Sequence, residues 1–532
     1  MLDLPRVQVK THLLPILALI AVTFVIYSGV LSHDFVNTWD DDVYVTANEA
    51  VRGFSLSHLR AAFTQIYSGN YAPVQIVSYM LDYTFWGYRA GGFLLSNVVY
   101  HAINGILFYW LLIRIQKTQA LALVAALLFL CHPVQVESVA WVSQRKNLLA
   151  MLFFLISFHC YLGYHERKGG KGWPHYGYAL LFFMVSLLAK AITVIMAPIV
   201  VLYEQCFNNG NSWRRKILPA IPFFAAAVAM SLVTFVSQTP GRAPYFGGNP
   251  LSTVYTMLPI FVRYLRMVVW PSDLCASYTL PVRSVPDLPV LLSALFFLLL
   301  GTGSIYLYHR RRDLFFWFLV FFIGLAPVSQ VIPIMTLIND RYLYFPMLGA
   351  SVLLAEALLI AYGIAAGRVR ILTIAGVCAV VVAMSYLTFK QAAVWENSIT
   401  LWSDVTGKYP GDTDAWNALG DSYLENGDRK SALSAYKNTI AACDSMSNCQ
   451  YYEPTFDRIG SIYRENSNLQ EAREYFDGLV VKNPNYPGEY LQLAKIYYQL
   501  GDYQKARENI DKVLRIQPDN YMALELQKRY RK

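Results

Sequence analysis

Residues 12–31 read HLLPILALIAVTFVIYSGVL, twenty residues without an Asp, Glu, Lys or Arg. An α-helix needs about 20 apolar residues to cross the hydrocarbon core of a bilayer. The run is long for a signal peptide and lacks a clear small-x-small cleavage site, so it predicts a retained membrane span. Three consecutive carboxylates follow it, Asp40, Asp41 and Asp42. Three like charges at the edge of a span need a physical explanation.

The composition divides the chain into two parts. Of its 532 residues, 55% are hydrophobic and only 15% are charged, whereas soluble domains carry about 25% charge. Lys and Arg outnumber Asp and Glu by 44 to 35, an excess that in a polytopic protein usually marks cytoplasmic loops. No basic, aromatic-interleaved patch indicates nucleic acid binding. The apolar runs stop near Phe389, so we predict a membrane domain over 1–390 and a soluble tail over 391–532.

Apolar runs in the first part predict an all-α, polytopic membrane domain of about eleven spans. Several runs are shorter than the roughly 20 residues of a full crossing, so their bounds are approximate. The predicted spans lie near residues 12–31, 93–114, 118–132, 147–164, 176–189, 191–206, 216–237, 288–308, 314–332, 342–362 and 369–388.

The charges of the loops predict the orientation of the membrane domain. With a cytoplasmic N-terminus, alternate loops each carry a tight basic cluster, as the positive-inside rule requires. This orientation needs the amphipathic segment 255–270 to lie at the membrane interface instead of crossing. It places the three Asp residues, the 238–287 loop and the tail outside the cytoplasm. The basic clusters are Arg6 and Lys10; Arg114 and Lys117; Arg167, Lys168 and Lys171; Arg214, Arg215 and Lys216; Arg310, Arg311 and Arg312; and Arg368 and Arg370.

The tail contains an internal repeat. Three windows align: WNALGDSYLENGDRKSAL (416–433), TFDRIGSIYRENSNLQEAR (455–473) and YLQLAKIYYQLGDYQKAR (490–507). The second and third are 34 residues apart, with small residues at the expected helix crossings and Pro at the end, which is typical of the tetratricopeptide repeat. We therefore predict three repeats. Stacked helix pairs form a concave surface that usually binds protein or peptide, although a structural cap on the membrane domain remains an alternative.

An insertion of about six residues in the first repeat holds Cys443 and Cys449. On the extracytoplasmic side these two thiols could form a disulfide. The other five cysteines lie in or near apolar runs and are predicted to be core residues.

Two readings of Asp40, Asp41 and Asp42 compete. They could begin a solvated loop or cap a helix N-terminus, where negative charge is favoured. Alternatively, a carboxylate beside like charges at a low-dielectric rim has a raised proton affinity. Such a group suits the removal of a proton from an acceptor hydroxyl.

Several cations are predicted to lie at span ends on the side where the positive-inside rule disfavours them. Pairing with the phosphates of bulk lipid would explain them, and so would a bound lipid-linked phosphate that departs as a leaving group. Arg grips phosphate with paired donors, whereas Lys acts as a point charge. These cations are Arg145, Lys146, Lys190, Arg263, Arg266 and Arg341.

Motifs along nearly the whole chain, in this order, resemble the transmembrane and tetratricopeptide-repeat O-mannosyltransferases and their bacterial relatives. That family has the multi-span GT-C glycosyltransferase fold. The motifs are DFVNTWDDDVYVTAN (34–48), HAIN (101–104), HPVQVESVAWVSQRKNLLA (132–150), SLLAKA (186–191), YLRMVVWPSDL (264–274), NDRYLYFP (339–346) and VWENSITLW (394–402), followed by the repeats.

The resemblance implies roles for particular residues. The family pair of acids stands seven residues before an Asn; counting back from Asn48 gives Asp40 and Asp41, one of them catalytic, with Asp40 favoured. Asp42 could shift this register. His132 and Glu137 would shape the site, and Arg145 would meet the donor phosphate, although Glu137 could simply pair with Arg145. Lys190 and Arg341 match further family positions, Arg341 with Asp340 as an alternative partner. Additional site-shaping candidates are His101, Asp340 and Tyr342.

Two positions depart from the bacterial pattern: Ala72 replaces an Arg before Pro73, and Leu94 stands where His is usual. These positions could contact the sugar or the acceptor, so mannose is not assumed.

The sequence thus predicts a glycosyltransferase that moves a sugar from a polyprenyl-phosphate carrier to a hydroxyl, favouring Ser or Thr of a protein docked by the repeats. Direct displacement predicts inversion at the sugar carbon. We expect no cofactor; three Asp could hold Mg²⁺ or Mn²⁺, but the resemblance favours metal-independent chemistry. The lean loops and short array favour a bacterial inner membrane, with periplasmic repeats.

Three alternatives remain. A non-enzymatic scaffold or assembly factor would use the repeats for docking, but would not need acids and cations at one rim. A transporter would place ionisable groups near mid-membrane and show paired broken helices. An enzyme could also act on a lipid or glycan acceptor.

Overall fold

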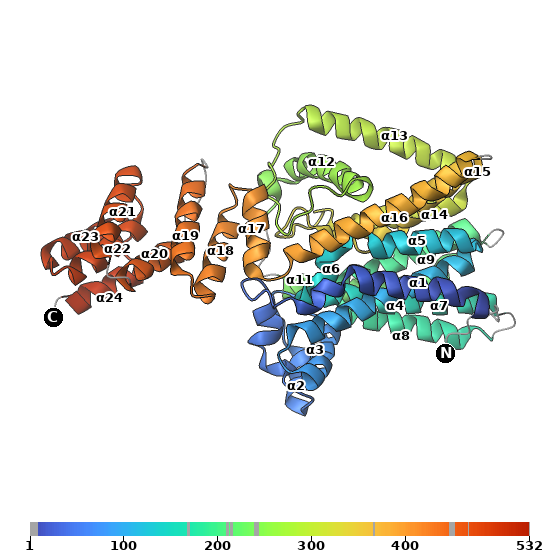
Figure 1. The fold of residues 1–532 in the computed structure, drawn as a ribbon, viewed down its shortest axis with the longest axis horizontal. Coiled ribbons are helices and arrows are strands. Elements are labelled where there is room, and N and C mark those ends of the chain that lie inside the picture. The colour runs from blue at the N-terminus through green and yellow to red at the C-terminus, as the bar shows by residue number, and fades with distance from the viewer. Residues whose placement is uncertain are drawn as a thin grey trace. The chain divides into compact units, whose positions relative to one another are not determined.

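The computed structural model describes residues 9–167, 171–208, 212, 216–238, 244–364, 368–445, 453–465 and 468–530. Within these ranges the secondary structure is helical throughout, without a β-strand (Figure 1). The predicted all-α fold is therefore confirmed. Of the predicted basic clusters, Arg6, Lys168, Arg214 and Arg215 lie outside the described residues, as do the side chains of Lys10, Arg368 and Arg370.

The chain forms two compact units, Met1–Leu401 and Trp402–Lys532. The change in composition near residue 390 precedes this division, because the last apolar run ends inside α16 (Arg368–Val394) and a short polar segment follows before the division. The two units are described separately.

Unit 1 holds a helix at each predicted apolar run. Figure 1 shows α4, α5, α7 and α8 running side by side. The helices are α1 Val9–Ile26, α2 Leu56–Thr64, α3 Pro73–Trp86, α4 Ala90–Gln116, α5 Gln119–Cys131, α6 Val136–Ala140, α7 Arg145–Glu166, α8 Trp173–Ala189, α9 Met196–Phe207, α11 Ile221–Ser237, α12 Pro250–Val269, α13 Leu288–Arg310, α14 Arg312–Leu325, α15 Met347–Ile364 and α16, with α17 (Ser398–Lys408) at the division.

The predicted count of eleven spans is not confirmed. Six helices among the described residues are long and apolar enough to cross a membrane, and α5 with Pro133–Ala140, bent by 55°, could form a seventh. Three further apolar helices are shorter, Thr11–Ile26, Trp173–Ala189 and Ala191–Phe207. The difference arises because the other predicted runs form apolar helices shorter than 18 residues. For example, α8 ends at Ala189 before Lys190, and α14 ends at Leu325, two residues before Pro327.

Polar contacts gather several helix ends at one end of unit 1. They join the end of α4 to that of α7, the start of α1 to that of α5, and the end of α9 to that of α13. The contacts are Arg114–Glu166 at 2.9 Å, Gln119 Nε2 to Thr11 O at 3.0 Å, and Gln205 Nε2 to Tyr308 Oη at 2.9 Å. The basic loops at these helix ends therefore share one end, as predicted. Which side of a membrane this end faces stays a prediction.

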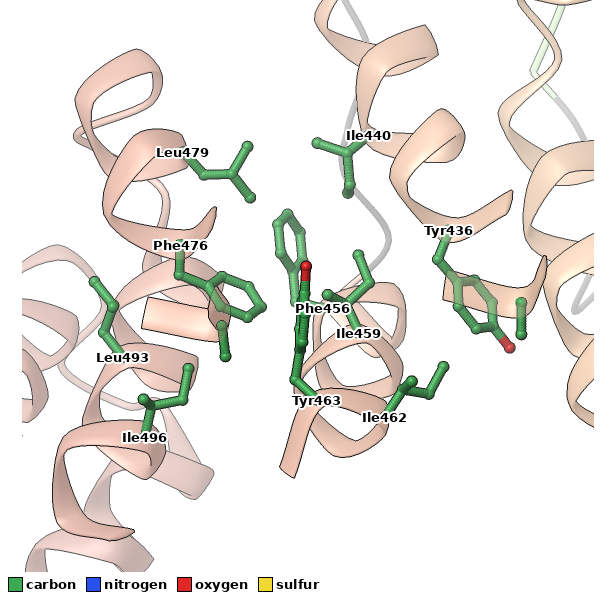
Figure 2. Close-up of a cluster of buried hydrophobic side chains, with 12 residues drawn as sticks. Tyr436, Ile440, Phe456, Ile459, Ile462, Tyr463, Phe476, Leu479, Leu493 and Ile496 are labelled. Atoms are coloured by element: carbon green, nitrogen blue, oxygen red, sulfur yellow. The ribbon is translucent and has the colours of Figure 1, made fainter. Parts of the chain in front are cut away.

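Unit 2 consists of three helix pairs and a final helix. Small residues let the paired helices approach closely: a Cβ added to Gly420 would lie 2.4 Å from the Tyr436 ring. Figure 2 shows the apolar interior, where Phe456, Tyr463 and Phe476 lie among aliphatic side chains. The helices are α18 Thr413–Glu425, α19 Arg429–Asp444, α20 Glu453–Glu465, α21 Leu469–Lys482, α22 Pro487–Gln499, α23 Tyr503–Ile516 and α24 Tyr521–Tyr530.

The Gly-Asp pairs of the repeat windows form turns between paired helices. Gly427 and Gly501 have a φ of 80°, a left-handed conformation that suits glycine. Asp428 and Asp502 then cap α19 and α23, each accepting a hydrogen bond from a backbone N–H of the first turn. Cys443 is buried in α19 and is disulfide-bonded, but Cys449 lies outside the described residues. The pairing of Cys443 with Cys449 therefore stays a prediction.

Candidate functional site

The first loop folds Asp41 inward. Its side chain is 1% exposed. One carboxylate oxygen accepts a hydrogen bond from Val36 N at 2.8 Å, and the other accepts from Ser143 N at 2.9 Å and from the Ser143 hydroxyl. Asp41 stands at the N-cap position of the helical turn Asp42–Thr46, but its side chain does not cap that turn. It joins the first loop to the segment before α7 instead.

Burial raises the pKa of the Asp41 carboxyl to about 6, although the hydrogen bonds from Ser143 and Val36 act in the opposite direction. Burial also raises the pKa of Asp42, which is half-buried and accepts a hydrogen bond from Val43 N at 2.7 Å. For both acids the main cause is burial, and the like charge of Asp40 is a smaller one.

Asp40 is half-buried. Its Oδ1 accepts a hydrogen bond from Ser68 Oγ at 2.9 Å, in the connection between α2 and α3. The three consecutive acids therefore have different environments, with Asp41 enclosed and both Asp40 and Asp42 reached by solvent.

Three cations interact electrostatically beside Asp40. Lys146 Nζ donates to Tyr44 Oη at 3.2 Å and lies 4.5 Å from the centre of the Tyr44 ring. Lys190 Nζ donates to Asn147 Oδ1 at 2.7 Å. The charge of Asp40 acts on Lys146 and on Arg341, and the charges of Lys146 and Arg341 act on Lys190. We call Lys146, Lys190 and Arg341 the cation cluster.

Glu137 partly balances the cation cluster. It is 1% exposed and accepts hydrogen bonds from both the backbone N–H and the guanidinium of Arg341. The sequence alternatives, a Glu137–Arg145 pair and an Arg341–Asp340 pair, are not the pairs found; Glu137 pairs with Arg341 instead. The Arg341 guanidinium also lies 5.8 Å from the Trp39 ring centre and 5.5 Å from that of Trp141.

Arg145 precedes Lys146 in the chain, but its partners differ from those of the cation cluster. Its side chain is fully buried and pairs with Asp82 at 2.5 Å. Nε donates to Asn97 Oδ1 at 2.8 Å, and NH2 donates to Phe93 O at 2.6 Å. Every nitrogen of this guanidinium has a protein partner. This arrangement favours a packing role, while the predicted phosphate contact stays untested.

The remaining predicted cations lie on α12. Arg266 pairs with Asp273 at 2.5 Å, and both side chains are exposed. Arg263 lies 5.0 Å from the Tyr278 ring centre, and the Tyr278 hydroxyl donates to Asp340. These contacts join α12 to the segment before α15, which carries Arg341.

The other predicted site-shaping residues hold segments together. His132 Nε2 contacts Val268 O at 2.9 Å, and His101 Nδ1 contacts Tyr344 Oη at 2.9 Å. Both imidazoles are fully buried. The Tyr342 hydroxyl lies 2.6 Å from Thr336 Oγ1. These residues support the segments that carry the site.

Four residues of this site were not predicted. Ser143, Tyr44 and Trp141 lie inside quoted motifs but carry no charge, so the search for ionisable groups passed over them. Ser68 lies outside every quoted motif, and its place beside Asp40 depends on the path of the α2–α3 connection. Among the described residues, no group of three His, Cys, Asp or Glu is arranged to hold a metal ion.

The fold and the site define an α-helical protein with apolar helices able to cross a membrane, an acid and a cation cluster at the start of α7, and C-terminal repeats. The family model "Tetratricopeptide repeat" matches residues 487–520, which form α22 and α23.

The particular relatives are protein O-mannosyl-transferases. Protein O-mannosyl-transferase TMTC3 of Homo sapiens is 22% identical over 465 residues, 76% of this chain and 48% of that protein. Protein O-mannosyl-transferase F38B6.6 of Caenorhabditis elegans is 22% identical over 494 residues, 88% of this chain and 63% of that protein. The chain thus spans about half to two thirds of these relatives, and the predicted resemblance is confirmed.

A solved structure is also similar to the chain, namely ArnT from Cupriavidus metallidurans bound to undecaprenyl phosphate. The sequences are 14% identical, the match covers 82% of this chain and 76% of that one, and the TM-score is 0.39.

Proposed function

We propose that this protein is an integral membrane glycosyltransferase that moves a sugar from a polyprenyl-phosphate carrier to a hydroxyl, on Ser or Thr of a protein, outside the cytoplasm. The observation that supports the proposal most strongly is the half-buried Asp40 carboxylate beside the cation cluster of Lys146, Lys190 and Arg341. The relatives named as O-mannosyl-transferases agree with this chemistry.

Asp40 would act on the acceptor hydroxyl of such a reaction, and the cation cluster on its leaving group. Asp40 is reached by solvent, so it could accept the proton of an acceptor hydroxyl as that oxygen attacks the sugar carbon. The cation cluster would stabilise the negative charge that develops on the departing lipid phosphate. Glu137 pairs with Arg341, whereas Lys146 and Lys190 donate to the neutral partners Tyr44 and Asn147, so these two lysines would be the donors available to that phosphate.

Direct displacement by the acceptor needs no covalent intermediate on the enzyme, so we propose that the sugar carbon inverts. The buried Asp41 suits a supporting role better than a base, because both of its oxygens already accept hydrogen bonds. The repeats would dock the acceptor protein, and the membrane would be a bacterial inner membrane with the N-terminus in the cytoplasm. Metal-independent chemistry is part of the same proposal.

The test measures transfer of radiolabelled sugar in membranes, from a panel of polyprenyl-phosphate sugars to endogenous proteins. Asp40→Asn is compared with wild type at matched expression, and Asp34→Asn, an exposed acid of the same loop, is the control. We expect Asp40→Asn to lower transfer by about 10²–10⁴-fold, with normal thermal unfolding and donor binding. Chelation by EDTA should leave transfer unchanged.

Wild-type membranes that transfer none of the sugars would contradict the proposal, as would an active Asp40→Asn variant. The second candidate, a membrane-anchored scaffold that uses the repeats for docking, would then be favoured.

A further inference from the structure

We infer that Ser68 is a positioning residue for the reaction: its hydroxyl holds the Asp40 carboxylate in the orientation that takes the acceptor proton. This inference rests on the proposed function. It concerns the turn Tyr67–Asn70, which connects α2 to α3 and lies beside Asp40.

The turn is held in an unfavourable backbone conformation. Ser68 has a φ of 48°, in the left-handed region that non-glycine residues adopt rarely, and Gly69 follows with a φ of 70°. A non-glycine residue in this region costs roughly 1–3 kcal/mol, and such residues persist where the surrounding structure fixes them. Contacts with the surrounding structure must therefore hold the turn in this conformation.

Hydrogen bonds fix the turn from several sides. The backbones of Tyr67 and Asn70 bond to each other at 3.1 and 2.8 Å. Tyr67 O also accepts from the Tyr44 hydroxyl at 3.0 Å, and Asn70 Nδ2 donates to Ser68 O at 2.8 Å. Through these bonds the Ser68 backbone is fixed from both sides.

The turn is thereby joined to the cation cluster. The Tyr44 hydroxyl that donates to the turn also accepts a hydrogen bond from Lys146 Nζ at 3.2 Å. The same short network therefore connects the proposed phosphate-binding cation, the turn and the proposed base. A displacement of the turn would move Ser68 relative to Asp40 and disturb Tyr44 beneath Lys146.

The Ser68 hydroxyl donates to Asp40 Oδ1 at 2.9 Å. In the part of the chain that the structure describes, this is the hydrogen bond found for the Asp40 side chain. It leaves Oδ2 for the proton of the acceptor. A donor on one oxygen fixes the orientation of the carboxylate, so Oδ2 would face the acceptor hydroxyl.

The test separates the hydroxyl from the backbone conformation. Ser68→Gly removes the hydroxyl and relieves the left-handed strain, whereas Ser68→Ala removes the hydroxyl and keeps the strain. Ser57→Ala is the matched control, because Ser57 is an exposed serine in α2, the helix that precedes the turn. Initial rates of sugar transfer are measured with each variant, together with KM for the polyprenyl-phosphate sugar.

We expect Ser68→Gly and Ser68→Ala to lower kcat about tenfold, as for one hydrogen bond to a charged group. KM for the donor should change less than twofold. Ser57→Ala should match wild type.

A wild-type kcat for Ser68→Gly would overturn the inference, and so would a loss of activity that appears as a higher KM for the donor with kcat unchanged. Impairment of Ser68→Ala alone would assign the effect to backbone strain and would also overturn it. Failure of the proposed function is distinguishable, because wild type and Ser57→Ala would then transfer no sugar.

Discussion

Two neighbouring regions at the N-terminal end of α7 differ in how fully their charges are matched. In the first, Arg145 pairs with Asp82 and donates to Asn97 and Phe93, and all four residues are buried. In the second, one residue further along the chain, Lys146 donates to a tyrosine hydroxyl and shares its surroundings with two other cations. Adjacent cations on one helix thus have opposite environments.

The acids of the first loop repeat this contrast. Asp41 is enclosed and accepts from Val36 and Ser143, whereas Asp40 is half-buried and meets the exposed Ser68. Charges matched within the protein hold its segments together, and charges without a charged partner are available to a ligand. Under the proposed function, Asp41 and Arg145 hold the segments of the site in place, and Asp40 and Lys146 contact the substrates.

The largest effect on stability is expected at Arg145. Arg145→Met leaves the Asp82 carboxylate buried without its ion pair, which costs about 3–5 kcal/mol. Thermal unfolding of the detergent-purified protein should show this loss, and the double variant Arg145→Met/Asp82→Asn should recover part of it, since the unpaired charge is then gone. A stable Arg145→Met protein that has lost donor binding would break the comparison and assign Arg145 to the phosphate.

Replacement of the next residue, Lys146, by Met should lower activity without lowering stability. Lys146→Met keeps the length of a side chain that is 4% exposed and removes a charge that is costly to bury. We expect thermal stability equal to or above that of wild type, with sugar transfer lowered about tenfold or more, as for a lost charged contact.

The control for this prediction is Lys390→Met, at an exposed position in α16. Titration of the purified variants with a polyprenyl-phosphate sugar should show weakened binding for Lys146→Met and normal binding for Lys390→Met. Equal donor affinity in the two variants would show that Lys146 does not meet the phosphate.

The sequence predicted residue types well and partners poorly. Apolar run length located the helices, and the 34-residue period located the repeats, because both signals are local in the chain. The cation cluster was predicted as a set, since charges at the ends of apolar runs are conspicuous. Arg145 and Lys146 could not be separated, because the partners of Arg145 come from other helices. Asn97 in α4 lies 48 residues before it, and Asp82 in α3 lies 63 residues before it.

Asp40 and Asp41 raised the same difficulty. Periodicity does not tell which of two adjacent acids faces inward in an irregular loop, and Ser143, which encloses Asp41, lies 102 residues away. Ser68 was missed for a related reason, since its left-handed backbone conformation has no signature in the letters Tyr-Ser-Gly-Asn beyond a turn. The fold followed from local patterns, whereas the partners of each charge required the tertiary structure.

The pH dependence of stability tests whether Asp41 supports the fold of the site. Burial raises its pKa in the folded protein to about 6, above the value of about 3.9 in an unfolded chain. The folded state therefore binds this proton more tightly, so its stabilising contribution is complete below about pH 4 and is lost as pH rises through about 6. The loss is at most about 3 kcal/mol.

Asp41→Asn should remove this pH dependence, because the amide cannot ionise. The thermal midpoint of wild type should fall between pH 4 and pH 7 relative to that of Asp41→Asn, while Asp34→Asn follows wild type. If the midpoints of wild type and Asp41→Asn ran parallel across this range, Asp41 would not change its proton affinity on folding. Burial of Asp41 would then have no measurable cost, and the distinction between an enclosed, supporting Asp41 and a reactive Asp40 would fail.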